Sequence, residues 1–303
     1  MPYDDRYARM NELVKDRHLL ANLPLLKGVD LGVATFDRLK ASTNYFLWDC
    51  LSTWYGDKSP PFCDNMLTEY EDLVRGLPNK TPNGILLPKR DVYASYNVVH
   101  KIVSEILAEH GLPRFFKQMM PINVRIVDGS DRDIDMRPTS PTRPHVEMWV
   151  GFPSNALVCL FPIFGNTRNV DVKFYEPREF PPDYQRALET YEHGLPLLEG
   201  ATQYDAHFDP GAMYLMDSFL IHHTHKTGPG LRLSVDFMCV YENPIASDAN
   251  TTMTRTVDML SPDEWVEIGR KRLWYAPMKL QGYVPQNTLY KHPAALELIK
   301  MER

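Results

Sequence analysis

The hydrophobic pattern of this 303-residue chain changes its period near Pro121. Before that point, apolar residues recur at spacings of three and four, the period of an amphipathic helix, most clearly over Val98–Leu107. After it, short runs rich in β-branched and aromatic residues alternate with turn residues, which is typical of strands. A helical part followed by many strands predicts an α+β fold in which helices cover a sheet.

The two periods predict the individual elements. We expect helical segments around residues 13–20, 33–47 and 98–107, the last ended by Gly111 and Pro113. Strands are expected at Ile122–Val127, His145–Gly151, Ala156–Phe164, Val170–Tyr175, Ala212–Met216, Phe219–His222 and Leu231–Tyr241. Two later helices are expected at Asp183–Tyr191 and after Ser261, which is suited to be an N-cap ahead of Pro262. Strands at this spacing favour a sandwich or a closed barrel.

We expect a single domain over residues 1–303, because no linker-like stretch separates the helical and β-rich parts. Within it, residues 1–120 would form a mainly helical cover and residues 121–243 the β core. Residues 244–303 would add a C-terminal helix and a tail.

Charge and composition restrict the partners. The chain carries 33 basic and 39 acidic residues, a net charge of −6, which disfavours nucleic acid and anionic membranes as main partners. It has no signal-peptide pattern and no apolar run long enough to span a membrane, so we expect a soluble cytoplasmic protein. Its four cysteines lack zinc-ligand spacing, and reduced thiols are expected.

The residues with the clearest chemistry are histidines and one carboxylate. His145 and Glu147 lie two apart, so on a strand they would point to the same face and offer an imidazole and a carboxylate to one metal ion. A histidine from a distant strand would complete a two-histidine, one-carboxylate triad, which leaves open positions on Fe(II). His222, His223 and His225 are all candidates for that third position.

Arg232 and Ser234 follow the tight turn Gly228–Gly230. An antiparallel pair of strands joined there would bring both side chains back beside the strand of His222. A guanidinium group binds a carboxylate through two parallel hydrogen bonds, so this pair is suited to hold the far carboxylate of a keto acid.

The order His145-x-Glu147, then His222, then Arg232-x-Ser234 resembles the Fe(II)/2-oxoglutarate-dependent oxygenase superfamily. The resemblance covers about residues 122–241. The segments RPHVEMWVGFP and DSFLIHHTHKTGPGLRLSVDF look closest to oxygenases of bacterial antibiotic and specialised-metabolite pathways, and they are also similar to a cupin-like protein of streptomycin biosynthesis. The resemblance implies a double-stranded β-helix (jelly roll) with an N-terminal helical layer.

The resemblance also implies a function. His145, Glu147 and His222 would hold Fe(II), Arg232 and Ser234 would bind 2-oxoglutarate, and O2 would be consumed to hydroxylate a C–H bond of a small polar metabolite. Family members often read Asp-Ser-x-x-x-His-x-Thr, which favours His222 as the distal ligand. Halogenases of this class lack the carboxylate, so Glu147 argues against halogenation. The substrate and the oligomeric state are not determined by the sequence.

Three further residues are candidates for the pocket. Asn123 and Arg125 lie two apart on a strand that should neighbour the metal strands, and both are candidates for substrate binding. An ordinary salt bridge is the alternative for Arg125. Trp149, two residues past Glu147, would be either a pocket wall or a core aromatic.

Two charged features have simpler interpretations. Lys173 is expected at the surface, since Arg232 is available for the keto acid. The acidic residues Asp131, Asp133 and Asp135 form a solvated turn or, alternatively, attract a cationic substrate. Their spacing is not that of an EF-hand, because the required Gly and Glu are missing.

Two other functions compete with the oxygenase. A metal-dependent cupin that isomerises or epimerises its substrate would use the same three ligands without needing Arg232 and Ser234. A non-catalytic β-sandwich binding module would have incidental histidines.

Overall fold

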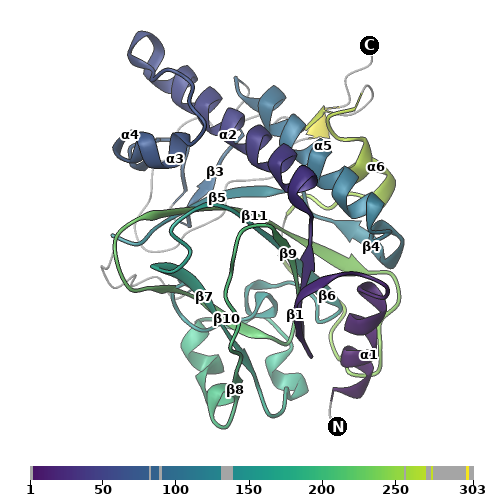
Figure 1. Ribbon diagram of the computed structural model, residues 1–303. Helices are drawn as coiled ribbons and strands as arrows, with labels where there is room; N and C mark the ends of the chain where they lie inside the picture. Colours follow the sequence, from purple (N-terminus) through teal and green to yellow (C-terminus); the bar gives the residue numbers. More distant parts are fainter. Residues whose placement is uncertain are drawn as a thin grey trace.

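The structure, a computed structural model, describes residues 3–81, 83–88, 91–130, 139–255 and 257–270, with the backbone of 274–275 and 298–299. In this part of the chain, most helices gather over one face of a large antiparallel sheet, the N-terminal helix lies apart from them, and a smaller sheet lies toward the opposite face (Figure 1). The helices are α1 (Asp4–Leu13), α2 (Val33–Tyr55), α3 (Met66–Glu69), α4 (Glu71–Arg75), α5 (Tyr93–Glu109) and α6 (Pro262–Glu267). Short 3₁₀ helices are η1 (Gly56–Lys58), η2 (Pro113–Phe115), η3 (Glu147–Val150), η4 (Pro182–Tyr184) and η5 (Tyr191–Leu198). None of the described helices combines the length and the hydropathy needed to cross a lipid bilayer.

The strands form antiparallel sheets. The large sheet has eight strands in the order β1-β2-β9-β6-β11-β5-β3, with β4 also paired to β11. The small sheet has the order β10-β7-β8, and β12 pairs with β13. The strand bounds are β1 (Leu19–Leu23), β2 (Leu26–Asp30), β3 (Ile85–Leu86), β4 (Phe116–Met119), β5 (Asn123–Asp128), β6 (Ala156–Gly165), β7 (Val170–Glu176), β8 (Thr202–Gln203), β9 (Ala212–Asp217), β10 (Ile221–Lys226), β11 (Leu231–Tyr241), β12 (Trp274–Tyr275) and β13 (Leu298–Ile299).

Strand β11 shows how the site is built, because its two faces differ in chemistry. Successive side chains of a strand point to opposite faces. The odd-numbered face is apolar and belongs to the core under the helices: Leu231, Leu233, Val235, Phe237, Cys239 and Tyr241. The even-numbered face points toward the small sheet and begins with the polar residues Arg232, Ser234 and Asp236, followed by the apolar Met238.

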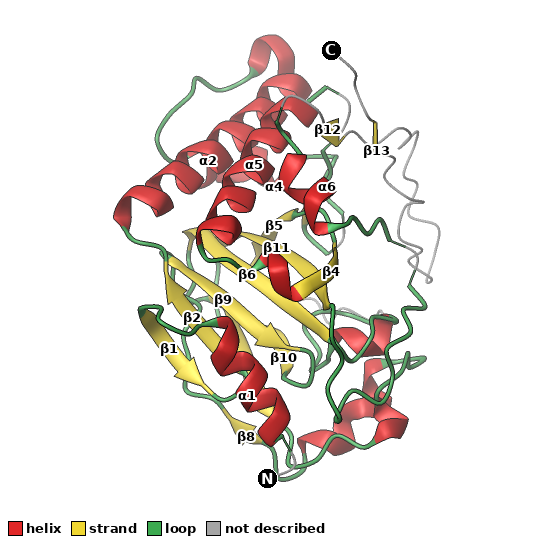
Figure 2. Ribbon diagram, turned by 90° about the vertical axis from the view of Figure 1, so that its right-hand side faces the viewer, coloured by secondary structure: helices red, strands yellow, loops and turns green. Residues whose placement is uncertain are grey.

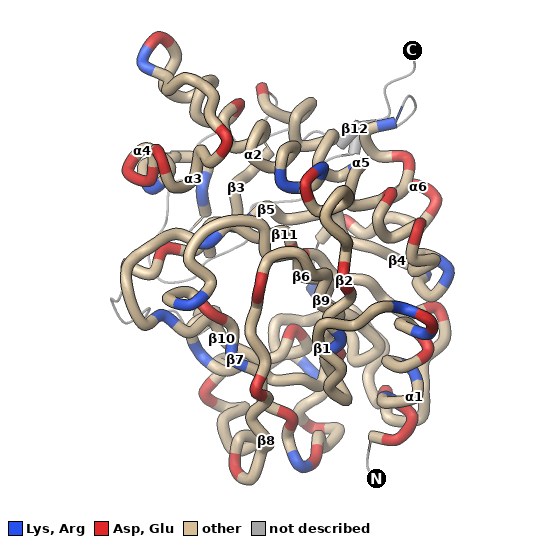
Figure 3. The backbone as a smooth tube through the Cα atoms, viewed as in Figure 1, with Lys and Arg blue, Asp and Glu red and all other residues tan. Residues whose placement is uncertain are grey.

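Two hydrophobic cores follow from this division. The first lies between the large sheet and α2 and α5, which pack side by side across it (Figure 2). The second lies between the large sheet and the small sheet and includes Phe174, Tyr214 and Phe219. Acidic and basic residues are interspersed along the whole described chain, on central strands as well as on helices and loops (Figure 3). Because the second core lies on the even-numbered side of β11, the polar face of this strand points into the interior between the two sheets.

Several sequence expectations are confirmed by the structure. Strand β11 has the expected bounds, and β6, β7 and β9 each extend one residue beyond theirs at the C-terminal end. Strand β5 is shifted by one residue at both ends. Helix α5 ends before Gly111, which adopts a left-handed backbone with φ of +60°. Helix α6 begins after Ser261, whose side chain forms a capping box with Glu264.

The first departure is N-terminal. Residues around Leu19 and Leu20 form the hairpin β1–β2 and not a helix. Burial alternates along β1, and the hairpin adds to the large sheet through β9. The expectation rested on Leu13, Leu19 and Leu20, which are too few to establish a helical period, and Pro24 lies in the hairpin turn.

Further departures lie close to the site. The expected strand His145–Gly151 is instead one bridging residue, His145, followed by η3. The expected helix Asp183–Tyr191 is replaced by η4 and η5, with Pro196 inside the latter. Strand β10 begins at Ile221 and runs to Lys226, so Phe219 belongs to the preceding turn. The predicted C-terminal tail and Asp131, Asp133 and Asp135 lie outside the described residues, except for β12 and β13.

Candidate functional site

His145 and His222 are held side by side by the backbone. The His145 N–H donates to the His222 carbonyl at 3.0 Å, and the His222 N–H donates to the His145 carbonyl at 2.9 Å. A third bond, from the Thr224 N–H to the Pro141 carbonyl at 2.8 Å, continues the pairing along β10. The two imidazole rings are consequently 4.5 Å apart between centroids.

Glu147 reaches the two histidines from the first turn of η3. Its Oε1 lies 3.8 Å from Nε2 of His222. One donor atom each from His145, Glu147 and His222 lies within 4.8 Å of the other two, which makes this a group able to hold a metal ion. His145 and Glu147 do lie close together, as expected, but the expected reason is wrong. A tight 3₁₀ turn, and not the alternation of side chains along a strand, brings the Glu147 carboxylate to the histidines.

Both imidazole rings are oriented by backbone carbonyls. Nδ1 of His145 lies 2.7 Å from the Arg143 carbonyl, and Nδ1 of His222 lies 3.3 Å from the Leu220 carbonyl. A carbonyl only accepts hydrogen bonds, so each Nδ1 carries the proton and each Nε2 keeps a lone pair for a metal. The His145 ring also stacks on Tyr191, with centroids 4.5 Å apart.

Burial keeps these imidazoles neutral. It lowers the pKa of His145 well below its usual value, and the neighbouring His222 lowers it further. Burial also lowers the pKa of His222, although the Glu147 carboxylate opposes that effect. Neutral imidazoles and a carboxylate are the donor set of a two-histidine, one-carboxylate iron site.

The structure distinguishes the three candidate distal histidines. His222 lies beside His145 and Glu147, whereas His223 and His225 are in no group of this kind among the described residues. Nδ1 of His223 lies 3.2 Å from the Thr142 carbonyl, and its Nε2 lies 3.2 Å from the Tyr175 hydroxyl. Strand alternation thus points His223 to the other face of β10.

The polar interior face of β11 continues onto the neighbouring strand β5. Arg125 lies opposite Ser234, and Asn123 lies opposite Asp236. Arg125 binds Asp236 through Nε at 2.7 Å and through Nη2 at 2.9 Å, and Asn123 donates to the same carboxylate at 3.1 Å. Asn123 and Arg125 therefore share the interior face with Arg232, and Arg125 forms the salt bridge that the sequence left open as an alternative.

Asp236 was missed by the sequence reasoning. It is the third member of the alternating series Arg232, Ser234, Asp236, so the period of two along β11 was the available signal. Its carboxylate is 11% exposed and neutralises the guanidinium of Arg125. One of the two interior arginines is thus already paired.

Arg232 is the other interior arginine, and it has no carboxylate partner among the described residues. It is 3% exposed, and its Nη1 donates to the Val170 carbonyl at 2.9 Å. Its Nε has no hydrogen-bond partner in the segments that the structure describes, and its guanidinium lies 5.0 Å from the ring centre of Phe208. Burial, followed by the repulsion of Arg125, lowers the pKa of Arg232 to about 10, although the carboxylates of Asp171 and Asp236 oppose this effect without pairing with the guanidinium. A buried guanidinium group without an anionic partner lowers the stability of the fold, and an anionic ligand would supply that partner.

The remaining candidates lie elsewhere. Trp149 is 1% exposed, its Nε1 donates to the Tyr184 carbonyl at 3.1 Å, and its ring packs so closely on Gly194 that a Cβ there would be 2.0 Å from it. These are the contacts of a core aromatic. Lys173 pairs with Asp171 at 2.9 Å and is one quarter exposed.

Comparison with known proteins gives only distant similarities. No family model and no curated protein matches the chain. AviO1 from Streptomyces viridochromogenes Tue57 is 12% identical, with a TM-score of 0.41, covering 80% of this chain and 98% of its own. EctD from S. alaskensis is 12% identical, with a TM-score of 0.37, covering 82% of this chain and 84% of its own.

A third solved structure is the epimerase SnoN in complex with Fe3+, alpha ketoglutarate and nogalamycin RO. It is 13% identical, with a TM-score of 0.37, covering 75% of this chain and 93% of its own. Similarities this distant do not by themselves assign an activity to the chain.

Proposed function

We propose that this protein is a non-haem Fe(II)/2-oxoglutarate-dependent oxygenase that hydroxylates a C–H bond of a small polar metabolite. One observation carries the proposal. The possible metal ligands His145, Glu147 and His222 and the buried Arg232, which has no carboxylate partner among the described residues, both lie in the interior between the two sheets. A metal site alone would fit many enzymes. A metal site beside a buried guanidinium without a carboxylate is suited to a metal-chelating anion.

The fold supports this interior location. We propose that the large sheet and the sheet β10-β7-β8 are the two layers of a double-stranded β-helix, with residues 1–303 forming one domain. His222 lies on the small sheet, and Arg232 lies on the large sheet. The two sheets would thus supply opposite walls of one pocket and exclude water from it.

The metal would be held by His145, Glu147 and His222 through Nε2, a carboxylate oxygen and Nε2. The carbonyls that accept from Nδ1 hold both rings in the orientation that this requires. When bound, Fe(II) with the keto acid would activate O2 for oxidation of a C–H bond. The protein's part is to leave three coordination positions open on one side.

The keto acid would be bound by Arg232 and Ser234. The free Nε of Arg232 and the adjacent Nη offer the two-pronged geometry that a carboxylate accepts. Ser234, two residues along the same face and 2% exposed, would add a hydroxyl donor. Arg125 would not compete with Arg232 for the co-substrate, because Asp236 already neutralises it.

We assign substrate recognition to the β5 side of the polar interior face, which is more accessible to solvent. Asn123 and Arg125 would contact the substrate, since the Arg125 side chain keeps 23% of its surface exposed. We propose a small polar molecule of specialised metabolism as substrate and no nucleic-acid or membrane partner, in keeping with the net charge of −6.

The test is anaerobic addition of Fe(II) and 2-oxoglutarate to the purified protein. We expect a visible iron–keto acid charge-transfer band, and succinate release once O2 is admitted. Glu147→Ala is expected to lose the band and iron retention while the protein stays folded. Metal binding without the band would favour the cupin isomerase or epimerase, and no metal binding would favour the binding module.

A further inference from the structure

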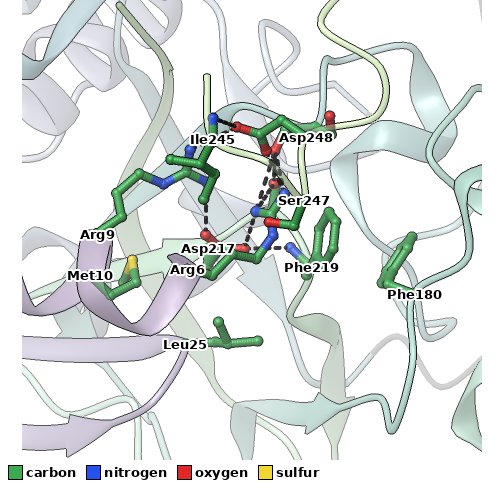
Figure 4. A network of polar contacts seen from close by, with 12 residues as sticks. Arg6, Arg9, Met10, Leu25, Phe180, Asp217, Phe219, Ile245, Ser247 and Asp248 are labelled. Carbon is green, nitrogen blue, oxygen red and sulfur yellow. Dashed lines mark hydrogen bonds and ion pairs between the residues drawn. The ribbon is translucent and has the colours of Figure 1, made fainter. Parts of the chain in front are cut away.

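A buried ionic network joins the N-terminal helix to the turn ahead of His222 (Figure 4). Arg6 and Arg9 of α1 each pair with Asp217, at the end of β9, and with Asp248, in the segment after β11. Arg6 lies 2.8 Å from Asp217, and Arg9 lies 2.9 Å from Asp248 and 3.3 Å from Asp217. The side chains of Arg6 and both aspartates have no exposed surface, and that of Arg9 has 9%. Two cations are thus balanced by two carboxylates away from water.

Aromatic rings hold the two guanidinium groups from the side. The Arg6 guanidinium carbon lies 3.2 Å from the ring centre of Phe219, and that of Arg9 lies 4.0 Å from the ring centre of Tyr241. Such stacking attracts a cation and keeps solvent from it. Both arginines are therefore restricted to one position.

The network sets the shape of the turn that precedes β10. Oδ1 of Asp217 accepts the N–H of Phe219 at 2.9 Å, in addition to the Arg6 guanidinium. The Asp217 carbonyl accepts the N–H of Leu220 at 3.0 Å. The hydroxyl of Ser218 donates to the Ser154 carbonyl at 2.5 Å. The turn is thus tied to α1 on one side and to the start of the β6 segment on the other.

The same turn ends at the carbonyl that orients His222. Leu220 accepts the hydrogen bond from Nδ1 of His222, and the distance of 3.3 Å is at the long end for such a bond. A small displacement of the turn would therefore break it. The ring would then lose the contact that keeps the proton on Nδ1 and the lone pair on Nε2.

We propose that Arg6 and Asp217 are positioning residues for the metal ligand His222. They hold the 217–220 turn so that the Leu220 carbonyl fixes the orientation and the tautomer of the imidazole. Hydrophobic residues of similar volume often stabilise a site as well as buried ion pairs do, so stability alone does not account for four buried charges. The role rests on the proposed function, since it requires His222 to bind the metal.

The test compares Asp217→Asn with Asp248→Asn. Both variants keep the side-chain size and remove one carboxylate from the same network, so both lower the thermal midpoint. Only Asp217 contacts the turn. In the metal-free protein, long-range ¹H–¹⁵N spectra of the histidine rings should show the Nδ1–H tautomer of His222 in the wild type and in Asp248→Asn, and mixed tautomers in Asp217→Asn. The resonance is assigned with His222→Gln.

Metal affinity gives the second measurement, by calorimetric titration with Co(II). We expect Asp217→Asn to bind about 10–100-fold more weakly, the usual effect of losing a residue that orients a ligand. Asp248→Asn should stay within about threefold of the wild type. An equal loss in both variants, or an unchanged tautomer and affinity in Asp217→Asn, would overturn the positioning role.

A second variant covers the case in which Asp217→Asn does not fold. Phe219→Leu keeps all four charges and removes only the ring beneath Arg6, so it should shift the tautomer in the same direction by a smaller amount. An unshifted tautomer in a folded Phe219→Leu protein would count against the proposal. A wild-type protein that binds no Co(II) would instead overturn the proposed function and this role with it.

Discussion

The buried arginines near α1 and the buried arginine of β11 differ in whether the chain gives them carboxylate partners. Arg6 and Arg9 meet two carboxylates, and every charge in that network has a partner of opposite sign. Arg232 is equally buried and meets a backbone carbonyl and an aromatic ring. Burial pulls the pKa of Arg9 down, but Tyr241, Asp217 and Asp248 together raise it above its usual value, whereas burial and Arg125 lower that of Arg232.

The difference separates structural from functional charge. Where the chain needs a buried arginine for its own architecture, it supplies the carboxylates itself, as it does again for Arg125 with Asp236. At Arg232 the described chain supplies none, and the missing anion is the feature that a ligand would complete. The predictions below test this contrast, beginning with the largest effect.

Removing one arginine from each group should affect stability very differently. Arg6→Met leaves Asp217 and Asp248 undercompensated, so the free energy of unfolding should fall by about 3–5 kcal/mol. Arg232→Met removes a buried charge that forms no ion pair with the described residues and whose pKa burial lowers, so the ligand-free protein should keep or gain stability. Urea denaturation of both variants measures this, and a loss in Arg232→Met as large as that in Arg6→Met would remove the contrast.

The second prediction concerns keto acid binding. Arg232→Met should weaken binding of 2-oxoglutarate to the metal-loaded protein by about 2–5 kcal/mol, because a buried charge pair loses one partner. Lys173→Met is the matched control, since Lys173 is paired with Asp171 and partly exposed. Calorimetry should find the control unchanged. Equal affinities in Arg232→Met and wild type would refute the assignment of the co-substrate site.

A third prediction uses a buried histidine, His100, because the usual pKa of an imidazole lies near neutral pH and burial changes it. His100 lies against Trp265, neither ring nitrogen has a hydrogen-bond partner within the described part of the chain, and burial lowers its pKa to about 3. As pH falls below about 6.5, the unfolded chain binds the proton and the folded chain does not, so stability is lost progressively toward pH 3. At pH 4.5 this amounts to about 2.5 kcal/mol relative to neutral pH.

His100→Leu should remove that part of the acid dependence. The comparison is the free energy of unfolding of variant and wild type at pH 7 and pH 4.5. Parallel pH profiles would show that His100 finds a partner in solution that lets it take up a proton.

The smallest expected effect is that of Asp236→Asn. Removing this carboxylate makes the interior more positive, so 2-oxoglutarate should bind slightly more tightly, by about 1 kcal/mol or less at the effective dielectric of a partly solvated site. Unfolding should become easier by a similar amount, since Arg125 loses its paired partner. Weaker keto acid binding would mean that Asp236 holds the Arg232 side of the pocket in shape.

Much of the architecture could be predicted because it depends on local periods. The alternation along β11 and the three–four spacing of α5 each follow from backbone geometry within a few residues. The same reasoning failed where a segment was short or turned tightly. The β1–β2 hairpin and η3 are examples, because a few residues do not establish a period and tertiary contacts decide the backbone.

The candidate site shows the same division. The residue types and the spacing His145-x-Glu147, with Arg232-x-Ser234 later, indicated a metal and a carboxylate ligand before any coordinates. The sequence left three histidines open, and the backbone bridge to His145 singled out His222. Asp236 escaped notice because an aspartate in a strand is unremarkable until Arg125 is known to lie beside it.

By itself, the sequence determined which faces are apolar and which side chains can do chemistry, since both follow from residue type and from the repeat of the backbone. Only the tertiary structure decided which charges are paired. Arg6 and Asp217, more than two hundred residues apart, meet, while Arg232 meets no acid within the described chain. The reason is physical: a periodic pattern acts over a few residues, whereas the partner of a buried charge depends on which distant segments the two sheets and α1 bring into contact.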